Sequence, residues 1–133
     1  MEEFYRVVQA LAQSPDVQSN LFPDFVNVAD ELVLDWGDVV ESEYFLQIKK
    51  GFSSEQQQAI SGLESYINEI SGKNIDTVWT TEAIYTSEEW VRIRNLAKEV
   101  IQLMGWDLDI PAKSSAIYIA EGRVEGGNPP ERE

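Results

Sequence analysis

Hydrophobic residues recur along most of this chain at the three- and four-residue spacing of an amphipathic helix. Residues 2–13 form the first such stretch. Pro15 ends it, because proline disfavours helical geometry in the residue before it. Residues 14–23 are therefore predicted to be a loop.

A second helical stretch runs from about Asp24 to about Glu41, with Pro23 near its first turn. When successive residues are placed 100° apart, its apolar side chains share one face: Phe25, Val28, Ala29, Leu32, Trp36 and Val39. The apolar pattern then loses its phase, which predicts a break between Gly37 and Glu43.

Two further helices begin at capping sequences. Ser53 or Ser54 is expected to cap a helix that ends at Gly72, since each is followed three residues later by a glutamine. Thr86, followed three residues later by a glutamate, is expected to cap another helix that ends at Gly105.

These patterns predict an all-α fold, a compact bundle of four main helices with one or two short elements. Residues 76–85 and 114–120 fit strands nearly as well, so an α+β fold with a small two-stranded sheet is the alternative. The length of 133 residues suits one domain, which we place at 1–121. Residues 122–133, rich in Gly, Pro and charge, are predicted to be a disordered tail.

The composition excludes several kinds of chemistry. The chain has no histidine and no cysteine, so histidine-assisted nucleophiles, His-ligated metals and disulfides are all ruled out. It also lacks a phosphate-binding loop and a dinucleotide fingerprint. We therefore predict a protein that is not an enzyme and that uses no cofactor. The lack of cysteine, of a signal peptide and of a long apolar run makes the cytoplasm the expected compartment.

The net charge of −14 bears on the partner. Phosphate contacts require clustered Lys and Arg, so direct binding to nucleic acid is disfavoured, as is binding to an anionic membrane. Basic proteins would instead be attracted at long range. The competing interpretation is that the charge only keeps the protein soluble.

The acidic residues are concentrated in one region, because the 42 residues from Val7 to Ile48 contain no lysine or arginine. On the predicted second helix, four carboxylates fall within about 60° of one another, beside the apolar face. With a tryptophan at their edge, they form the predicted partner-binding set: Asp24, Glu31, Asp35, Trp36 and Asp38. No lysine follows at i+4 to relieve the repulsion between the carboxylates.

Simpler interpretations of this set remain open. The carboxylates could be a solvated helix face, or could be relieved by Arg92, Arg94 and Lys98 of the last helix. Trp36 is most economically a core residue, although a tryptophan beside an acidic stripe could also anchor an interface.

The leading hypothesis is an acidic protein-binding module that neutralises or adapts a basic protein partner. In size and composition the chain is similar to immunity proteins and antitoxins, a similarity that rests on no motif and transfers no residue. One alternative is a divalent-metal hydrolase using Asp35, Asp38 and Glu41 as oxygen ligands. Others are a nucleic-acid mimic that occupies a DNA-binding protein, and a homo-oligomer packed through apolar helix faces.

Overall fold

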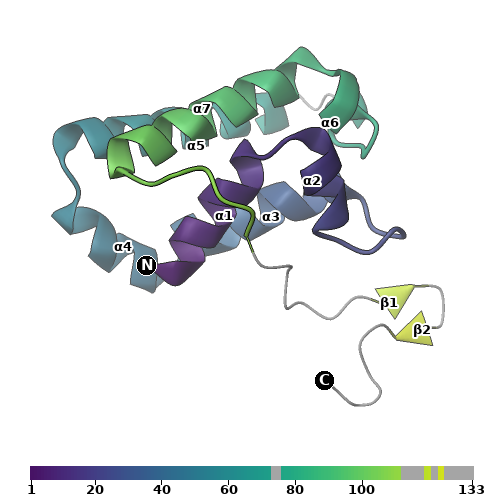
Figure 1. Cartoon of the computed structure of the whole chain (residues 1–133), viewed down its shortest axis with the longest axis horizontal. Coiled ribbons are helices and arrows are strands. Elements are labelled where there is room, and N and C mark those ends of the chain that lie inside the picture. The colour runs from purple at the N-terminus through teal and green to yellow at the C-terminus, as the bar shows by residue number, and fades with distance from the viewer. Residues whose placement is uncertain (73–75, 112–118, 121–122, 125–133) are drawn as a thin grey trace.

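Four helices build the body of the molecule, and α1 lies between two of them (Figure 1). The computed structural model describes residues 1–72, 76–111, 119–120 and 123–124. The four helices are α1 (Glu2–Ala12), α3 (Val28–Val40), α5 (Ser54–Gly72) and α7 (Glu88–Met104). α1 packs against both α3 and α7, and α5 packs against α7. The predicted all-α class is confirmed.

Short elements connect these helices. They are α2 (Pro15–Asn20), α4 (Glu43–Ile48), η1 (Lys49–Gly51), η2 (Asp76–Val78) and α6 (Ala83–Thr86), where η marks a 3₁₀ helix. Two-residue strands β1 (Ile119–Ala120) and β2 (Arg123–Val124) pair antiparallel with each other. The alternative prediction, a sheet that pairs 76–85 with 114–120, is wrong, because 76–85 contains the helices η2 and α6. Residues 114–118 and most of the predicted tail at 122–133 lie outside the described residues.

The predicted loop at 14–23 is wrong, because it contains α2. Ser14 is the N-cap, and its Oγ accepts a hydrogen bond from the backbone N–H of Val17 at 3.4 Å. Pro15 then occupies the first helical position, where a missing N–H leaves no bond unmade. The residues that end α1 therefore also start the next helix.

α3 begins four residues later than predicted. Its N-cap is Asn27, whose Oδ1 accepts a hydrogen bond from the Asp30 N–H at 3.3 Å. The Nδ2 of the same side chain donates to the Trp79 carbonyl at 2.6 Å. Asp24 lies in the turn before this cap. The predicted break after Gly37 is confirmed, since α3 ends at Val40 and α4 starts at Glu43.

Capping bonds define the ends of the two longest helices. The Ser53 Oγ accepts from the Gln56 N–H at 3.1 Å, and the Gln56 Oε1 accepts from the Ser53 N–H at 2.8 Å, which completes a capping box before α5. The predicted cap of α7 is wrong by one residue, because Ser87 and not Thr86 accepts the capping bond. α7 stops at Gly105 as predicted, in a left-handed conformation with φ of 76°.

Aromatic side chains around Phe4 join α1, α3, α4 and the chain beyond α7. Ring centroids lie 6.3 Å away for Trp36, 4.9 Å for Phe45, 5.8 Å for Phe52 and 6.0 Å for Trp106. Large rings bury much apolar area, and their tilted contacts add to the stabilisation. This cluster packs α4 and the chain beyond α7 against α1 and α3.

Two glutamines of α1 hold the extended segment 106–111, which runs back over α1 after α7 (Figure 1). The fully buried Gln9 donates to the Asp107 carbonyl and accepts from the Asp109 N–H, both at 2.8 Å. Gln13 donates to the Asp109 carbonyl at 2.7 Å. The buried Gln9 amide thus finds both a hydrogen-bond acceptor and a donor on this backbone.

Candidate functional site

The predicted partner-binding residues do not form one continuous stripe. Asp24 is exposed but lies outside α3, so the prediction that it shares a helix face with the others is wrong. Trp36 is only 2% exposed and packs in the core against Phe4. Asp38 is exposed, whereas Glu31 and Asp35 are half-buried. Neither half-buried carboxylate is free of partners.

Asp35 forms an ion pair across the α1–α3 contact. Its Oδ2 lies 3.7 Å from an Nη1 of Arg6, and the two side chains are 20% and 30% exposed respectively. Burial raises the pKa of Asp35, and the neighbouring carboxylate of Asp38 raises it further, while Arg6 lowers it. The relief for Asp35 therefore comes from Arg6 of α1.

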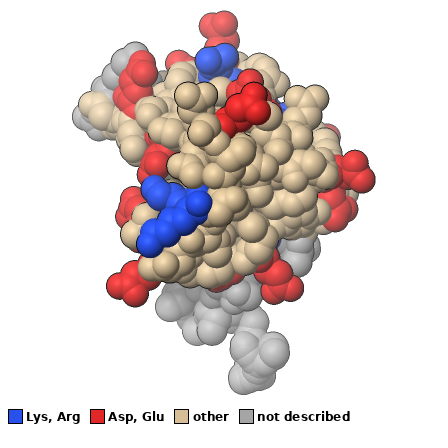
Figure 2. Space-filling model, turned by 90° about the vertical axis from the view of Figure 1, so that its left-hand side faces the viewer, with Lys and Arg blue, Asp and Glu red and all other residues tan. Residues whose placement is uncertain are grey.

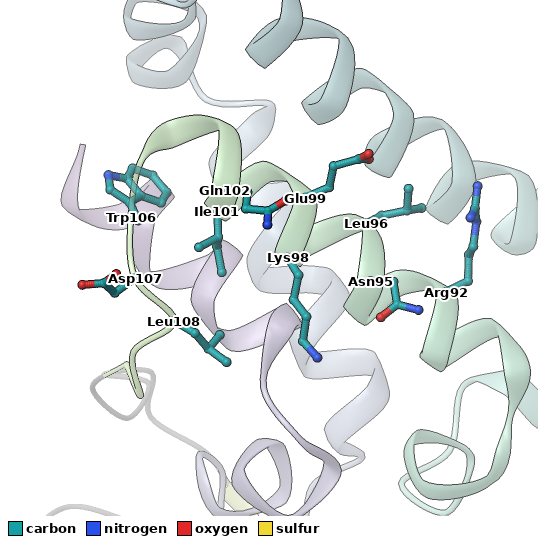
Figure 3. A pocket seen from close by; sticks show the side chains of 10 residues that line it. All are labelled: Arg92, Asn95, Leu96, Lys98, Glu99, Ile101, Gln102, Trp106, Asp107 and Leu108. Carbon is teal, nitrogen blue, oxygen red and sulfur yellow. The ribbon is translucent and has the colours of Figure 1, made fainter.

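The three cations of α7 have other surroundings. Arg94 donates to the Ile84 carbonyl at 2.8 Å and to the Gln18 Oε1 at 3.3 Å, and burial lowers its pKa. Arg92 lies 6.0 Å from the ring centre of Tyr66. Lys98 lines a hollow of about 530 Å³ between α7 and residues 106–108 (Figure 3). Within the described part of the chain, none of the three forms an ion pair with an α3 carboxylate.

The hollow in Figure 3 has mixed polarity and mixed charge. Arg92 and Lys98 line it together with Glu99 and Asp107, so positive and negative side chains balance around it. Trp106 stands at its far end, next to the last turn of α7. The hollow therefore favours neither a cationic nor an anionic ligand.

The proposed metal ligands do not come together either. Asp35 is paired with Arg6, whereas Asp38 and Glu41 line a different surface. Across residues 1–72 and the other described segments, no three acidic side chains gather closely enough to hold a metal ion.

An open seam separates α3 from α5. The packed pairs are α5 with α7, α7 with α1, and α1 with α3, but α3 and α5 do not pack closely along their length. A hollow of about 230 Å³ lies in this seam. We call it the acidic hollow, and its lining residues are Val33, Leu34, Trp36, Gly37, Asp38, Val40, Glu41, Glu64, Ile67, Asn68 and Ser71.

Among the residues that the structure describes, three carboxylates and no cation line the acidic hollow. Asp38 belongs to the last turn of α3, Glu41 is the residue that caps the C-terminus of α3, and Glu64 comes from α5. Buried apolar residues, among them Trp36 and Ile67, form its base. A lysine or arginine could place its charged end among the carboxylates and its aliphatic stem on the apolar base.

Leu34 adds an exposed apolar side chain to the edge of the acidic hollow. It is 57% exposed, the most exposed large apolar residue of α3. Interfaces commonly combine such apolar contacts with charges at their rim. The site therefore offers both electrostatic and hydrophobic contacts.

Sequence reasoning found one of these three carboxylates and missed two. Asp38 was in the predicted partner-binding set, whereas Glu41 was named only as a ligand of the alternative metal site. Glu64 lies on a different helix, and no signal in the sequence shows that α3 and α5 flank one hollow. The true neighbours were set by the packing of the helices.

A second hollow of about 450 Å³ lies between α4 and α5. Glu64 lines both hollows, so they meet at this residue. We call the two together the furrow. The second hollow is lined by Phe45, Lys49, Ser54, Gln57, Gln58, Ile60, Ser61 and Glu64.

The charge is distributed unevenly over the surface. On the face drawn in Figure 2, acidic side chains stand around a broad uncharged area, and basic side chains occupy few places. With 24 acidic and 10 basic residues, at least 14 carboxylates lack a basic partner of their own. The acidic hollow is one place where carboxylates gather beside exposed apolar surface.

Comparison of the chain with protein-family models, with curated proteins and with solved structures gave no match. Among the described helices, none combines the length and the apolar character needed to cross a bilayer.

Proposed function

We propose that this protein is an acidic binding module that neutralises or adapts a basic protein partner, with the acidic hollow as its binding site. The observation that carries the proposal is the lining of this hollow. Within the described part of the chain, Asp38, Glu41 and Glu64 line it and no lysine or arginine does. Exposed Leu34 lies beside them.

Two physical effects support this assignment. The net charge of −14 draws basic proteins toward the surface and raises the rate of encounter at low salt. Once the partner is in contact, apolar surface at Leu34 contributes affinity that charge alone does not supply. The site thus differs from the predicted one, which used Asp24, Glu31 and Asp35.

The test is affinity capture from the native organism with charge-reversed variants. Asp38→Lys with Glu41→Lys removes two carboxylates from the hollow. Both positions lie at the C-terminal end of α3, where positive charge suits the helix dipole, so the fold is expected to survive. A specific basic protein retained by the native chain should be lost by this variant.

The matched control is Glu82→Lys with Glu99→Lys, which makes the same change in net charge at exposed positions outside the hollow. This control should retain the partner, with an association rate closer to that of the native chain. If both variants lose the same proteins equally, only the net charge matters and the hollow is not the site.

A further inference from the structure

The wall of the furrow that α5 provides runs nearly the whole length of that helix. Its residues include Ser54, Gln57, Ser61, Glu64, Asn68 and Ser71, which alternate in steps of three and four. From the first to the last of these, a helix rises about 26 Å. Most of them are small and uncharged, so a neighbouring chain could approach α5 closely.

Another side of α5 is packed in the core. Leu63 and Ile70 are buried there, whereas Ile60 and Ile67, also buried, line the furrow from below. Along the furrow, by contrast, α3 does not close on α5, and α4 reaches only its first half. α5 therefore has one packed face and one open face.

The repeat of the open face matches a helix better than an extended strand. Side chains on one face of α5 recur about every 5.4 Å, the pitch of any α-helix that lies against it. Side chains on one face of a strand recur about every 6.6 Å, so a strand would fall out of step along the furrow. Side-chain ridges of a helix can fit between those of α5.

The two ends of the furrow differ in charge. Asp38 and Glu41 line the end at the C-terminal half of α5, and Glu64 lies where the two hollows meet. Lys49 lines the other end, and Lys50 follows it in the chain. An occupant that matches both ends carries positive charge at one end and negative charge at the other.

We infer that the furrow binds an α-helix of the partner protein, about 18 residues long, with Lys or Arg at one end and Asp or Glu at the other. The helix lies along α5 with its basic end over Asp38, Glu41 and Glu64 and its acidic end near Lys49. This inference rests on the proposed function and extends its site from the acidic hollow to the whole furrow.

The probes for a test are two stapled 18-residue helical peptides of Ala, Leu, Lys and Glu. One carries all its lysines in one half and all its glutamates in the other, and the second has the same composition with the charges interleaved. Titrated into the ¹⁵N-labelled full chain, the first should bind about tenfold more tightly. It should shift amide signals from Ser54 to Ser71, and a spin label at its lysine end should broaden the signal of Asp38.

A blocking variant and a matched control sharpen the test. Ser61→Trp fills the middle of the furrow at an exposed position, and Gly62→Trp adds the same side chain at an exposed position that lines neither hollow and has open space around it. The first should weaken binding of the charge-segregated peptide about tenfold or more, and the second should leave it unchanged.

Several outcomes would overturn this inference without touching the proposed function. Equal affinity for the two peptides would show that the charges at the two ends of the furrow do not select the occupant. Shifts that stop at Glu64 and spare Gln57 and Ser61 would confine binding to the acidic hollow. Concentration-dependent shifts of the same residues in the protein alone would show that a second copy is the occupant. The proposed function fails separately, if the basic protein captured from the native organism binds the variant Asp38→Lys with Glu41→Lys as well as it binds the native chain.

Discussion

The carboxylate of Asp35 sits in a half-buried position on α3 beside Arg6. Burial is the largest influence on it and raises its pKa, and the ion pair at 3.7 Å offsets this only in part. The folded protein therefore holds the Asp35 proton more tightly than the unfolded chain does. Ionisation of Asp35 costs stability as the pH rises through its unfolded-state pKa, and the cost is fully present above the folded-state pKa.

Asp35→Asn is expected to raise the free energy of unfolding at pH 7, by up to about 1 kcal/mol, because it removes the cost of ionising a half-buried group. Below pH 3.5 the gain should shrink, since Asp35 is then protonated in both states. Urea unfolding at the two pH values measures this. Glu99→Gln, at an exposed position of α7, is the control. A loss at pH 7 larger than that of the control would mean that the pair with Arg6 outweighs burial.

Single residues show where sequence reasoning stops. Helical periodicity correctly placed Val28, Leu32 and Trp36 on the buried face, because burial follows the helix repeat. It failed to pair Asp35 with Arg6, since that contact depends on how α1 crosses α3. The prediction of an acidic stripe treated α3 as an isolated helix. In the folded protein, the elements packed against α3 determine which of its carboxylates stay exposed.

At the scale of the element, the N-terminus of α5 raises the question of which serine caps the helix. The sequence left Ser53 and Ser54 as alternatives, and in the structure Ser53 both gives and receives the bonds of the capping box. Ser53→Ala should lower the free energy of unfolding by about 1 kcal/mol, because it leaves the Gln56 N–H without its side-chain acceptor.

Ser54→Ala is the matched control for this prediction, since Ser54 is the first residue of the helix, where alanine is well tolerated. It should change stability by less than about 0.5 kcal/mol. Thermal and urea unfolding of both variants measure the difference. Equal losses in the two variants would contradict the assignment of Ser53 as the cap.

Element boundaries were predictable where the signals are local. α1, α5 and α7 follow their apolar repeats, and Gly105 ends α7 through its left-handed backbone. The start of α3 depends on distant residues: Asn27 donates to the Trp79 carbonyl, and the Val28 N–H donates to the Thr81 Oγ1 at 3.0 Å. Contacts more than 50 residues apart along the chain leave no local pattern.

At the scale of the whole molecule, the open seam between α3 and α5 was beyond prediction from the sequence. The bundle of helices was predictable, because four amphipathic stretches must bury their apolar faces together. Which pair of helices stays apart depends on the order of packing, in which α1 lies between α3 and α7. That order, and not the acidic composition, places Glu64 opposite Asp38 and Glu41.

The excess negative charge has a consequence for stability. Charges repel within the compact state, and at 0.01 M salt the screening length is about 30 Å, larger than the spacing of neighbouring carboxylates. A net charge of −14 on 133 residues is therefore expected to destabilise the fold at low salt. Sodium chloride at 0.5 M should raise the free energy of unfolding by about 1 kcal/mol or more.

Two variants of equal net charge locate this repulsion. Asp38→Lys with Glu41→Lys and Glu82→Lys with Glu99→Lys both take the net charge from −14 to −10. Both should show a smaller gain with salt than the native chain, as measured by urea unfolding at 0.01 and 0.5 M sodium chloride. The gain should fall more for the first pair, because its carboxylates lie together with Glu64 around one hollow. If salt raises the free energy of unfolding equally in all three proteins, it acts through general effects on hydration. Repulsion among the carboxylates of the acidic hollow would then not destabilise the fold, and a basic partner would gain nothing by relieving it.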